Sequence, residues 1–91
     1  MAKRMQEYAS KSNPHDDVLR DVLDLYPNLH DKFTRDVLKA QLMDRLYNDE
    51  NEAERLLTVL RTTPGRYGLD WRRINWKGRS VFGYYRIRLQ E

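Results

Sequence analysis

The sequence contains no cysteine and no long apolar run, and these two absences exclude several classes of protein. Without cysteine, the chain can form neither a disulfide framework nor a thiolate metal site. No apolar stretch approaches the roughly 20 residues that a membrane-spanning helix needs. The first residues, MAKRMQEYASKSN, also lack the apolar segment of a secretory signal. We therefore expect a cytoplasmic protein that does not bind a membrane.

Groups that could carry catalysis or hold a metal are also scarce. His15 and His30 are the only histidines, and neither has a carboxylate or second histidine at a diagnostic metal-ligand spacing. Gly65 and Gly68, in the segment PGRYG, are too sparse for a phosphate-binding loop. The carboxylates of residues 16–54 recur as helix faces and helix caps. We therefore expect that the protein is not an enzyme and needs no cofactor or metal.

The charged residues are unevenly distributed along the 91-residue chain, although its net charge is only +3. Residues 1–60 hold nine Lys or Arg and twelve Asp or Glu, a net charge of −3. Residues 61–91 hold eight Lys or Arg and two acids, a net charge of +6. Such a basic end can attract polyanions. The alternative is that it pairs with the acidic part of the same chain.

The beginning of the chain predicts an arm followed by a helix. Residues 1–12 show no hydrophobic period, which indicates a mobile N-terminal arm, and residues 13–91 are long enough for one small domain. Asn13 and Pro14 are typical of a helix start. The helix is expected to reach Tyr26, because Pro27 disfavours helical backbone in the residue before it.

A second helix is predicted over residues 31–47, with apolar residues on two opposite sides. One side holds Phe33, Val37, Ala40, Met43 and Tyr47; the other holds Leu38, Leu42 and Leu46. A surface helix has a single apolar stripe. Two stripes indicate either a central helix packed between two others or a homodimer that uses the stripe of Leu38, Leu42 and Leu46.

A third helix is predicted over residues 52–62. Asp49 or Asn51 can cap its start, with Glu52 or Glu54 three residues further on. The segment Thr62-Thr63-Pro64-Gly65 ends it.

The last part of the chain, residues 67–89, is rich in aromatic and basic residues and ends in a strand. Lys77 and Gly78 are typical of a hairpin turn. From Val81 the residues alternate. We assign Val81, Gly83, Tyr85, Ile87 and Leu89 to the core face, and Phe82, Tyr84, Arg86 and Arg88 to the exposed face. Residues 69–76 fit a strand or a short helix capped by Asp70, and we favour the strand.

Together these elements predict an α+β fold, a three-helix bundle followed by a C-terminal β-hairpin. This element order resembles that of a winged-helix domain, in which the hairpin would be the wing. If residues 70–76 were instead helical, they would complete a helix-turn-helix with Arg72, Arg73 and Asn75 as the recognition surface. One feature departs from the winged-helix pattern, because the acids Glu52 and Glu54 make the third helix a poor reader of a DNA groove.

The basic, aromatic end predicts a small nucleic-acid-binding protein, most directly a DNA-binding regulatory or accessory protein. Arginine and lysine bind phosphates, and aromatic rings can stack on bases. The predicted nucleic-acid-binding residues are Arg66, Arg72, Arg73, Asn75, Lys77, Arg79, Tyr84, Arg86 and Arg88. Trp, Tyr and Arg are also enriched at protein interfaces. The alternative is therefore a protein-interaction module, an adaptor or an inhibitor of another protein, that uses the same surface.

Overall fold

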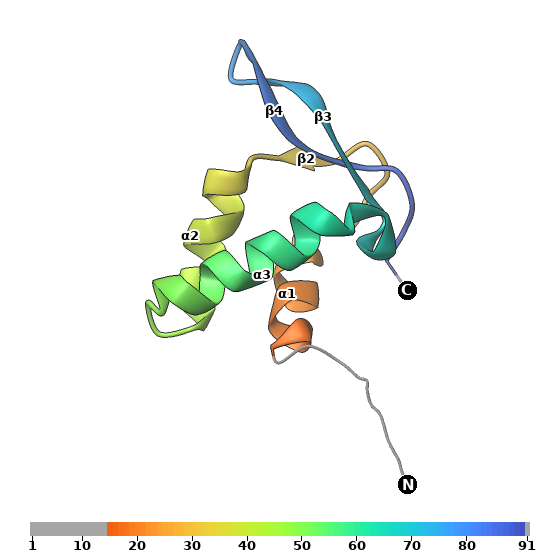
Figure 1. The fold of residues 1–91 in the computed structure, drawn as a ribbon. Coiled ribbons are helices and arrows are strands. Elements are labelled where there is room, and N and C mark those ends of the chain that lie inside the picture. Colours follow the sequence, from red (N-terminus) through yellow and green to blue (C-terminus); the bar gives the residue numbers. More distant parts are fainter. Residues whose placement is uncertain (1–14, 91) are drawn as a thin grey trace, which may run out of the picture.

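The computed structural model describes residues 15–90. Three helices are followed by an antiparallel hairpin, so the predicted α+β fold and its winged-helix-like element order are confirmed (Figure 1). The elements are α1 (Asp16–Leu23), β2 (Lys32–Phe33), α2 (Arg35–Arg45), α3 (Glu50–Thr62), the 3₁₀ turn η1 (Pro64–Tyr67), β3 (Leu69–Trp76) and β4 (Arg79–Arg86). The predicted arm over residues 1–12 and the predicted cap at Asn13 and Pro14 lie outside the described residues.

Helix α1 is shorter than predicted and ends at Leu23, before Tyr26. Asp16 and Asp17 lie in its first turn, where the helix dipole favours negative charge. Leu19, Val22 and Leu23 are buried against the other two helices. The residues that follow α1 turn towards the sheet, and Tyr26 stacks on Phe33 with ring centroids 4.4 Å apart.

The prediction of one helix over residues 31–47 is wrong at both ends. Lys32 and Phe33 form a short strand that pairs with β4, and Thr34 then caps α2 by accepting a hydrogen bond from the Val37 amide. Thr34 has extended backbone, with φ −92° and ψ 163°, so the helix cannot start before it. At the other end Tyr47 has a φ of 55°, in the left-handed region, and this stops the helix.

The prediction that a leucine stripe of α2 forms an exposed dimer surface is wrong. Leu38 and Leu42 have no exposed area, and Leu46 is 8% exposed, because all three belong to the core of this chain. Helices α1 and α3 both pack against α2. The other prediction, a helix packed on both apolar sides, holds only in part: α2 has two helical neighbours, but its opposite stripe is not fully buried, since Ala40 is exposed and Tyr47 is 96% exposed.

Helix α3 ends at Thr62 as predicted but begins at Glu50, two residues before the predicted start, and Asp49 is its cap. The Asp49 carboxylate accepts a hydrogen bond of 3.1 Å from the Glu52 amide. Ala53, Leu56, Leu57 and Leu60 form its buried side. The turn η1 then leads directly from α3 into the hairpin.

The sheet has the strand order β2-β4-β3 and is antiparallel throughout. Residues 69–76 form strand β3, which settles the choice between strand and helix. Lys77 and Gly78 form the predicted turn, and both have positive φ values, 52° and 79°. In Figure 1 the sheet lies on one side of the helices, and the far end of the hairpin projects beyond them.

The predicted faces of β4 are wrong, because the inward face is the one that we expected in solvent. Tyr84 is 1% exposed and Arg86 has no exposed area. Cross-strand partners share a face of the sheet, and these two residues lie opposite Trp71 and Leu69. On the outer face, Ile74 fills the space above Gly83: a Cβ on Gly83 would come within 2.6 Å of the Ile74 Cδ1 atom.

Arg86 is buried because backbone carbonyls surround its guanidinium. Its Nε donates to the Tyr26 carbonyl at 2.6 Å, and its Nη2 donates to the Leu23 carbonyl at 3.3 Å. Its Nη1 donates to the carbonyls of Tyr67 and Arg88, at 2.9 and 3.1 Å. One side chain thus joins the end of α1, the turn η1 and the C-terminal tail, residues 87–90.

No carboxylate hydrogen bonds to this guanidinium in the described part of the chain. Burial lowers the pKa of Arg86, while the charges of Asp24 and Asp31 act to raise it. An arginine side chain stays protonated in proteins, so the buried group is a cation solvated by carbonyl dipoles.

We predict that Arg86→Ala lowers the free energy of unfolding by about 3 kcal/mol, because it leaves several buried carbonyls without a donor. Arg79→Ala is the matched control: Arg79 lies on the same strand and is exposed, so its loss should change stability by less than about 0.5 kcal/mol. Urea unfolding followed by circular dichroism measures both. Equal unfolding midpoints for the two variants would contradict the structural role of Arg86.

Candidate nucleic-acid interface

The structure divides the nine predicted nucleic-acid-binding residues into three groups. Those on the hairpin are Arg72, Arg73, Asn75, Lys77 and Arg79; those near the base of the hairpin are Arg66 and Arg88; those in the interior are Tyr84 and Arg86. The interior pair has no accessible surface to offer a ligand. Including Tyr84 and Arg86 in the binding surface was therefore wrong.

The hairpin presents its basic residues on both faces. The register places Arg73 opposite Phe82 and Asn75 opposite Ser80, on the face that continues from the core. Arg72 lies opposite Gly83 on the other face. Arg79 is on that outer face too, opposite Trp76, and Lys77 occupies the turn. The cations therefore surround the projecting end of the hairpin instead of covering a single side.

On the inner face, two stacked aromatic rings lie between two arginines in a row that we call the cation–aromatic ladder, formed by Arg61, Trp71, Phe82 and Arg73. The Arg61 guanidinium lies 4.7 Å from the centroid of the Trp71 ring. The Trp71 and Phe82 rings stack with centroids 6.0 Å apart. The Arg73 guanidinium lies 4.6 Å from the centroid of the Phe82 ring. The ladder thus runs from the end of α3 onto the hairpin.

Three of the four residues of the ladder are accessible to solvent. Phe82 is 52% exposed, and the arginines at both ends, Arg61 and Arg73, are exposed as well. Trp71 is partly buried, because its other contact is the buried Tyr84 ring, with centroids 4.8 Å apart. The rings therefore rest on the core while their cations face solvent, an arrangement that holds guanidinium groups in place without neutralising them.

Arg61 was not among the predicted site residues, although it forms one end of the ladder. Arg61 lies four residues after the buried Leu57, at the edge of the buried side of α3. A cation at this position, in the last turn of the helix before the hairpin, was the available signal. It could not be used without knowing that the hairpin folds back beside α3.

On the outer face, Arg72 is already engaged by its own strand. Its Nε and Nη2 atoms lie 3.0 and 2.8 Å from the Asp70 Oδ2 atom. Its guanidinium also lies 4.5 Å from the centroid of the Tyr85 ring. The Tyr85 hydroxyl in turn forms a 2.6 Å hydrogen bond with the His30 Nδ1 atom. Asp70 thus reduces the positive field of this face.

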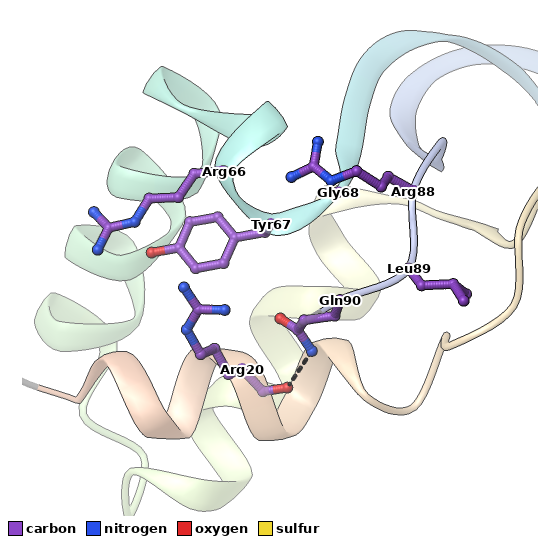
Figure 2. A pocket seen from close by; sticks show the side chains of 7 residues that line it. All are labelled: Arg20, Arg66, Tyr67, Gly68, Arg88, Leu89 and Gln90. Atoms are coloured by element: carbon purple, nitrogen blue, oxygen red, sulfur yellow. Dashed lines mark hydrogen bonds between the residues drawn. The ribbon is translucent and has the colours of Figure 1, made fainter.

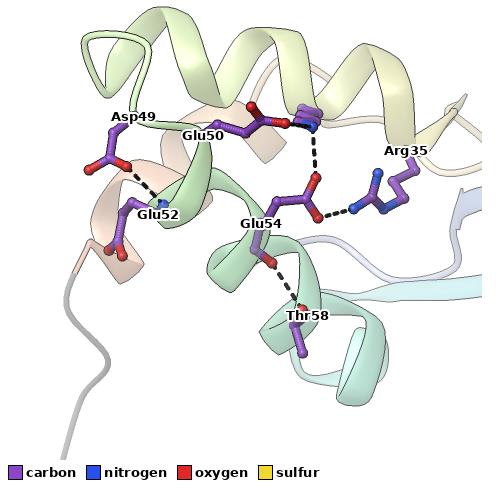
Figure 3. Close-up of polar contacts among 7 residues, drawn as sticks. Arg35, Asp49, Glu50, Glu52, Glu54 and Thr58 are labelled. Atoms are coloured by element: carbon purple, nitrogen blue, oxygen red, sulfur yellow. Dashed lines mark hydrogen bonds and ion pairs between the residues drawn. The ribbon is translucent and has the colours of Figure 1, made fainter.

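The acids of α3 are largely neutralised by cations of the helices, as Figure 3 shows. Lys39 lies 2.8 Å from the Glu50 carboxylate and 2.7 Å from that of Glu54. Arg35 pairs with Glu54 as well. These ion pairs join α2 to α3 and leave the hairpin cations out of the network.

Most of the exposed cations of the hairpin are therefore not neutralised by carboxylates. Within residues 15–90, the ion pair of Arg72 with Asp70 is the only one that a hairpin cation makes with a carboxylate. Arg73, Lys77 and Arg79 are exposed and make none there. The alternative that the basic end pairs with the acidic helices is wrong for these described residues.

Helix α3 itself is poorly suited to enter a DNA groove. Glu50 and Glu52 lie in its first turn, and Glu54 follows them. Hydrogen bonds from Arg55 and His15 lower the pKa of Glu52 to about 2, and those from Lys39 chiefly lower the pKa of Glu54. The carboxylates of Glu52 and Glu54 are therefore ionised at neutral pH, and because they occupy cations of the helices, this part of α3 offers phosphates no free positive charge.

No cluster of three or more His, Cys, Asp or Glu side chains suited to a metal ion occurs among residues 15–90. Nor does this part of the chain include a helix with the length and apolar character needed to cross a membrane. Comparison of the chain with models of known families, with curated proteins and with solved structures finds no match. The proposal below therefore depends on the geometry alone.

We predict that Glu52→Gln lowers the free energy of unfolding by about 1 kcal/mol at pH 7, a value discounted for solvent screening. The pKa of Glu52 is about 2 in the folded chain, against an ordinary value of 4.5 for a glutamate. A lowered folded-state pKa stabilises the protein above the unfolded value, and this stability is lost as the pH falls from about 4.5 towards 2. Urea unfolding at pH 7 and pH 3 should show most of the difference disappearing.

Asp44→Asn is the control for this experiment, because Asp44 is exposed on α2 and lies outside the ion pairs described here. If the deficit of Glu52→Gln were the same at both pH values, the ion pairs of Glu52 would not be the cause of the lowered stability.

Proposed function

We propose that this protein binds nucleic acid, most directly duplex DNA, and that the β3–β4 hairpin acts as a wing against the phosphate backbone. The proposal is supported by the element order of the fold and by the positions of the basic residues. It assigns the first contact to the hairpin and not to α3, in contrast to the usual winged-helix arrangement.

The observation that carries the proposal is a projecting hairpin with exposed cations that have no carboxylate partner in residues 15–90. Arg73, Lys77 and Arg79 surround its far end. Binding of such cations to a polyphosphate releases condensed counterions, which supplies much of the affinity of DNA-binding proteins. Cations that already pair with carboxylates of the protein would contribute less to the affinity, because they would have to break those pairs first.

The cation–aromatic ladder adds a second kind of contact. Phe82 exposes about half of its surface between the Trp71 ring and the Arg73 guanidinium. A ring held in this way can pack against a sugar or an unstacked base, while the guanidinium binds the neighbouring phosphate. Asn75 lies on the same face, and an amide can pair with the edge of adenine.

We predict that Arg73→Ala, Lys77→Ala and Arg79→Ala each weaken binding about three- to tenfold, as expected for one charge-assisted contact worth about 1 kcal/mol. Each variant should also reduce the slope of log affinity against log salt by about 1. Fluorescence anisotropy with labelled duplex and single-stranded oligonucleotides at two salt concentrations measures both effects.

Arg45→Ala is the matched control, since Arg45 is exposed in the last turn of α2, away from the sheet. It removes the same charge from the protein and should leave affinity within about twofold of the wild type. Absence of binding at low salt to every oligonucleotide would refute the proposal. The prediction of a protein-interaction module would then remain.

A change in the opposite direction tests the same proposal. Asp70 is the only acid between residues 61 and 90, and it pairs with Arg72. We predict that Asp70→Asn strengthens binding about two- to fivefold and steepens the salt dependence, because it releases Arg72 for a phosphate.

Asp44→Asn makes the same change of net charge at the far end of α2. If Asp44→Asn strengthened binding as much as Asp70→Asn, the effect would come from overall charge and not from the hairpin.

A further inference from the structure

A second group of arginines surrounds a cavity at the base of the hairpin, at the end opposite the turn. Its volume is about 270 Å³. Its walls come from α1, from the turn η1 and from the C-terminal tail, as Figure 2 shows. The lining residues are Arg20, Arg66, Tyr67, Gly68, Arg88, Leu89 and Gln90. Two of them, Arg66 and Arg88, belong to the predicted nucleic-acid-binding set but lie apart from the wing.

Three guanidinium groups border this cavity. Those of Arg20 and Arg66 lie 4.8 and 5.9 Å from the centroid of the same ring, that of Tyr67. Arg88 approaches from the tail, and its Nη2 donates to the Gly65 carbonyl at 2.7 Å. A guanidinium carries five N–H donors, so each of the three can bind a ligand in addition to its present partner.

The tail is held close to the cavity by backbone contacts. The amides of Ile87 and Arg88 both donate to the Gly68 carbonyl, at 2.9 and 3.1 Å. Gly68 has a φ of 75°, and a Cβ there would lie 2.2 Å from the Arg88 carbonyl oxygen. Only glycine allows this approach. Arg88 therefore enters the cavity from a fixed backbone position.

The cavity retains a positive charge after its acids are counted. Asp16 accepts from the Tyr67 hydroxyl at 2.7 Å and from the Arg20 Nε at 3.0 Å. Burial acts to raise the pKa of Asp16, but these two hydrogen bonds outweigh it, so the carboxylate is ionised. Arg66 and Arg88 make no ion pair with a carboxylate of residues 15–90. Two of the three cations are thus available to an anion.

One wall of the cavity also has an unsatisfied hydrogen-bond acceptor. The Gln90 amide donates through Nε2 to the Arg20 carbonyl at 3.2 Å and to the Asp24 Oδ1 atom. Its Oε1 atom is buried and has no partner among the described residues. A buried acceptor without a donor costs about 1–3 kcal/mol. A ligand hydroxyl group could satisfy this atom if the Gln90 side chain turned towards the cavity.

From these features we infer that Arg20, Arg66, Arg88 and Gln90 form a pocket, the arginine pocket, that binds the terminal phosphate of a phosphomonoester. A monoester carries nearly two negative charges at neutral pH and three acceptor oxygens, which match several guanidiniums at once. Where the esterified group is a sugar, as in a nucleotide, its hydroxyl groups can supply the donor that Gln90 lacks. The phosphate can come from a free nucleotide or from the 5′ end of a nucleic acid.

The test uses the full-length chain, isothermal titration calorimetry and three probes: inorganic phosphate, 5′-AMP and adenosine. We expect 5′-AMP to bind, inorganic phosphate to compete with it and adenosine to show no binding. Arg66→Ala and Arg88→Ala should each weaken 5′-AMP about fivefold or more. Arg45→Ala, which removes an exposed cation from the last turn of α2 and belongs to neither proposed site, should leave it unchanged.

Thermal melting of the same variants checks that they fold. Because Arg88 also binds the Gly65 carbonyl, Arg66→Ala decides the result if Arg88→Ala is unstable. The inference is overturned if 5′-AMP does not bind, if adenosine binds as tightly, or if Arg66→Ala leaves the affinity unchanged.

Two oligonucleotides that differ only in a 5′ phosphate identify the source of the group. Tighter binding of the phosphorylated strand, lost in Arg66→Ala, would support a nucleic-acid end as the ligand. Equal binding of the two strands, with 5′-AMP still bound, would support a free phosphomonoester. The variants of the wing residues test the proposed function separately, so failure of one proposal does not imply failure of the other.

Discussion

The buried guanidinium of Arg86 is the constraint on which the rest of the structure depends. Its hydrogen bonds reach carbonyls at Leu23, Tyr26, Tyr67 and Arg88, which belong to three separate segments of the chain. Because Arg86 must face these carbonyls, the alternation of strand β4 puts Tyr84 into the core as well. The same contacts set the end of α1 beside the tail, where the arginine pocket forms.

The separation of charge within the molecule follows from local pairing. The acids of α3 find their cations three residues away on the same helix, in Arg55, or at the start of α1 and on α2. All of these cations belong to the helical part of the chain, so the acids do not draw the hairpin cations towards the body. A sequence with an acidic part and a basic part thus folds into a molecule in which the two remain distinct.

Local signals in the sequence were enough to predict most of the fold. Asp49 was identified as a possible cap of α3, and Lys77 with Gly78 as the hairpin turn, because each depends on neighbouring residues only. The two-residue strand at Lys32 and Phe33 was missed, because such a short segment has no period of its own. Only its pairing with β4, more than 50 residues away, gives it a structure.

The binding surface was harder to predict than the fold. Period-two alternation divides β4 into two faces but does not say which one the helices cover. We chose by polarity, and Arg86 reversed the choice, since backbone carbonyls can solvate a buried cation. Arg61 was missed for a related reason: its partner Trp71 is ten residues further on, in a different element, and only the path of the chain through the turn η1 into β3 brings the two together.

The turn of the hairpin carries a residue that local stability alone would not select. Lys77 has left-handed backbone, a conformation that costs most residues about 1–2 kcal/mol and that asparagine and glycine adopt more readily. The chain therefore keeps an exposed ammonium group in the turn of the hairpin, although the backbone conformation there favours other residues. Favourable interactions elsewhere in the fold must therefore offset the conformational free energy that this turn costs.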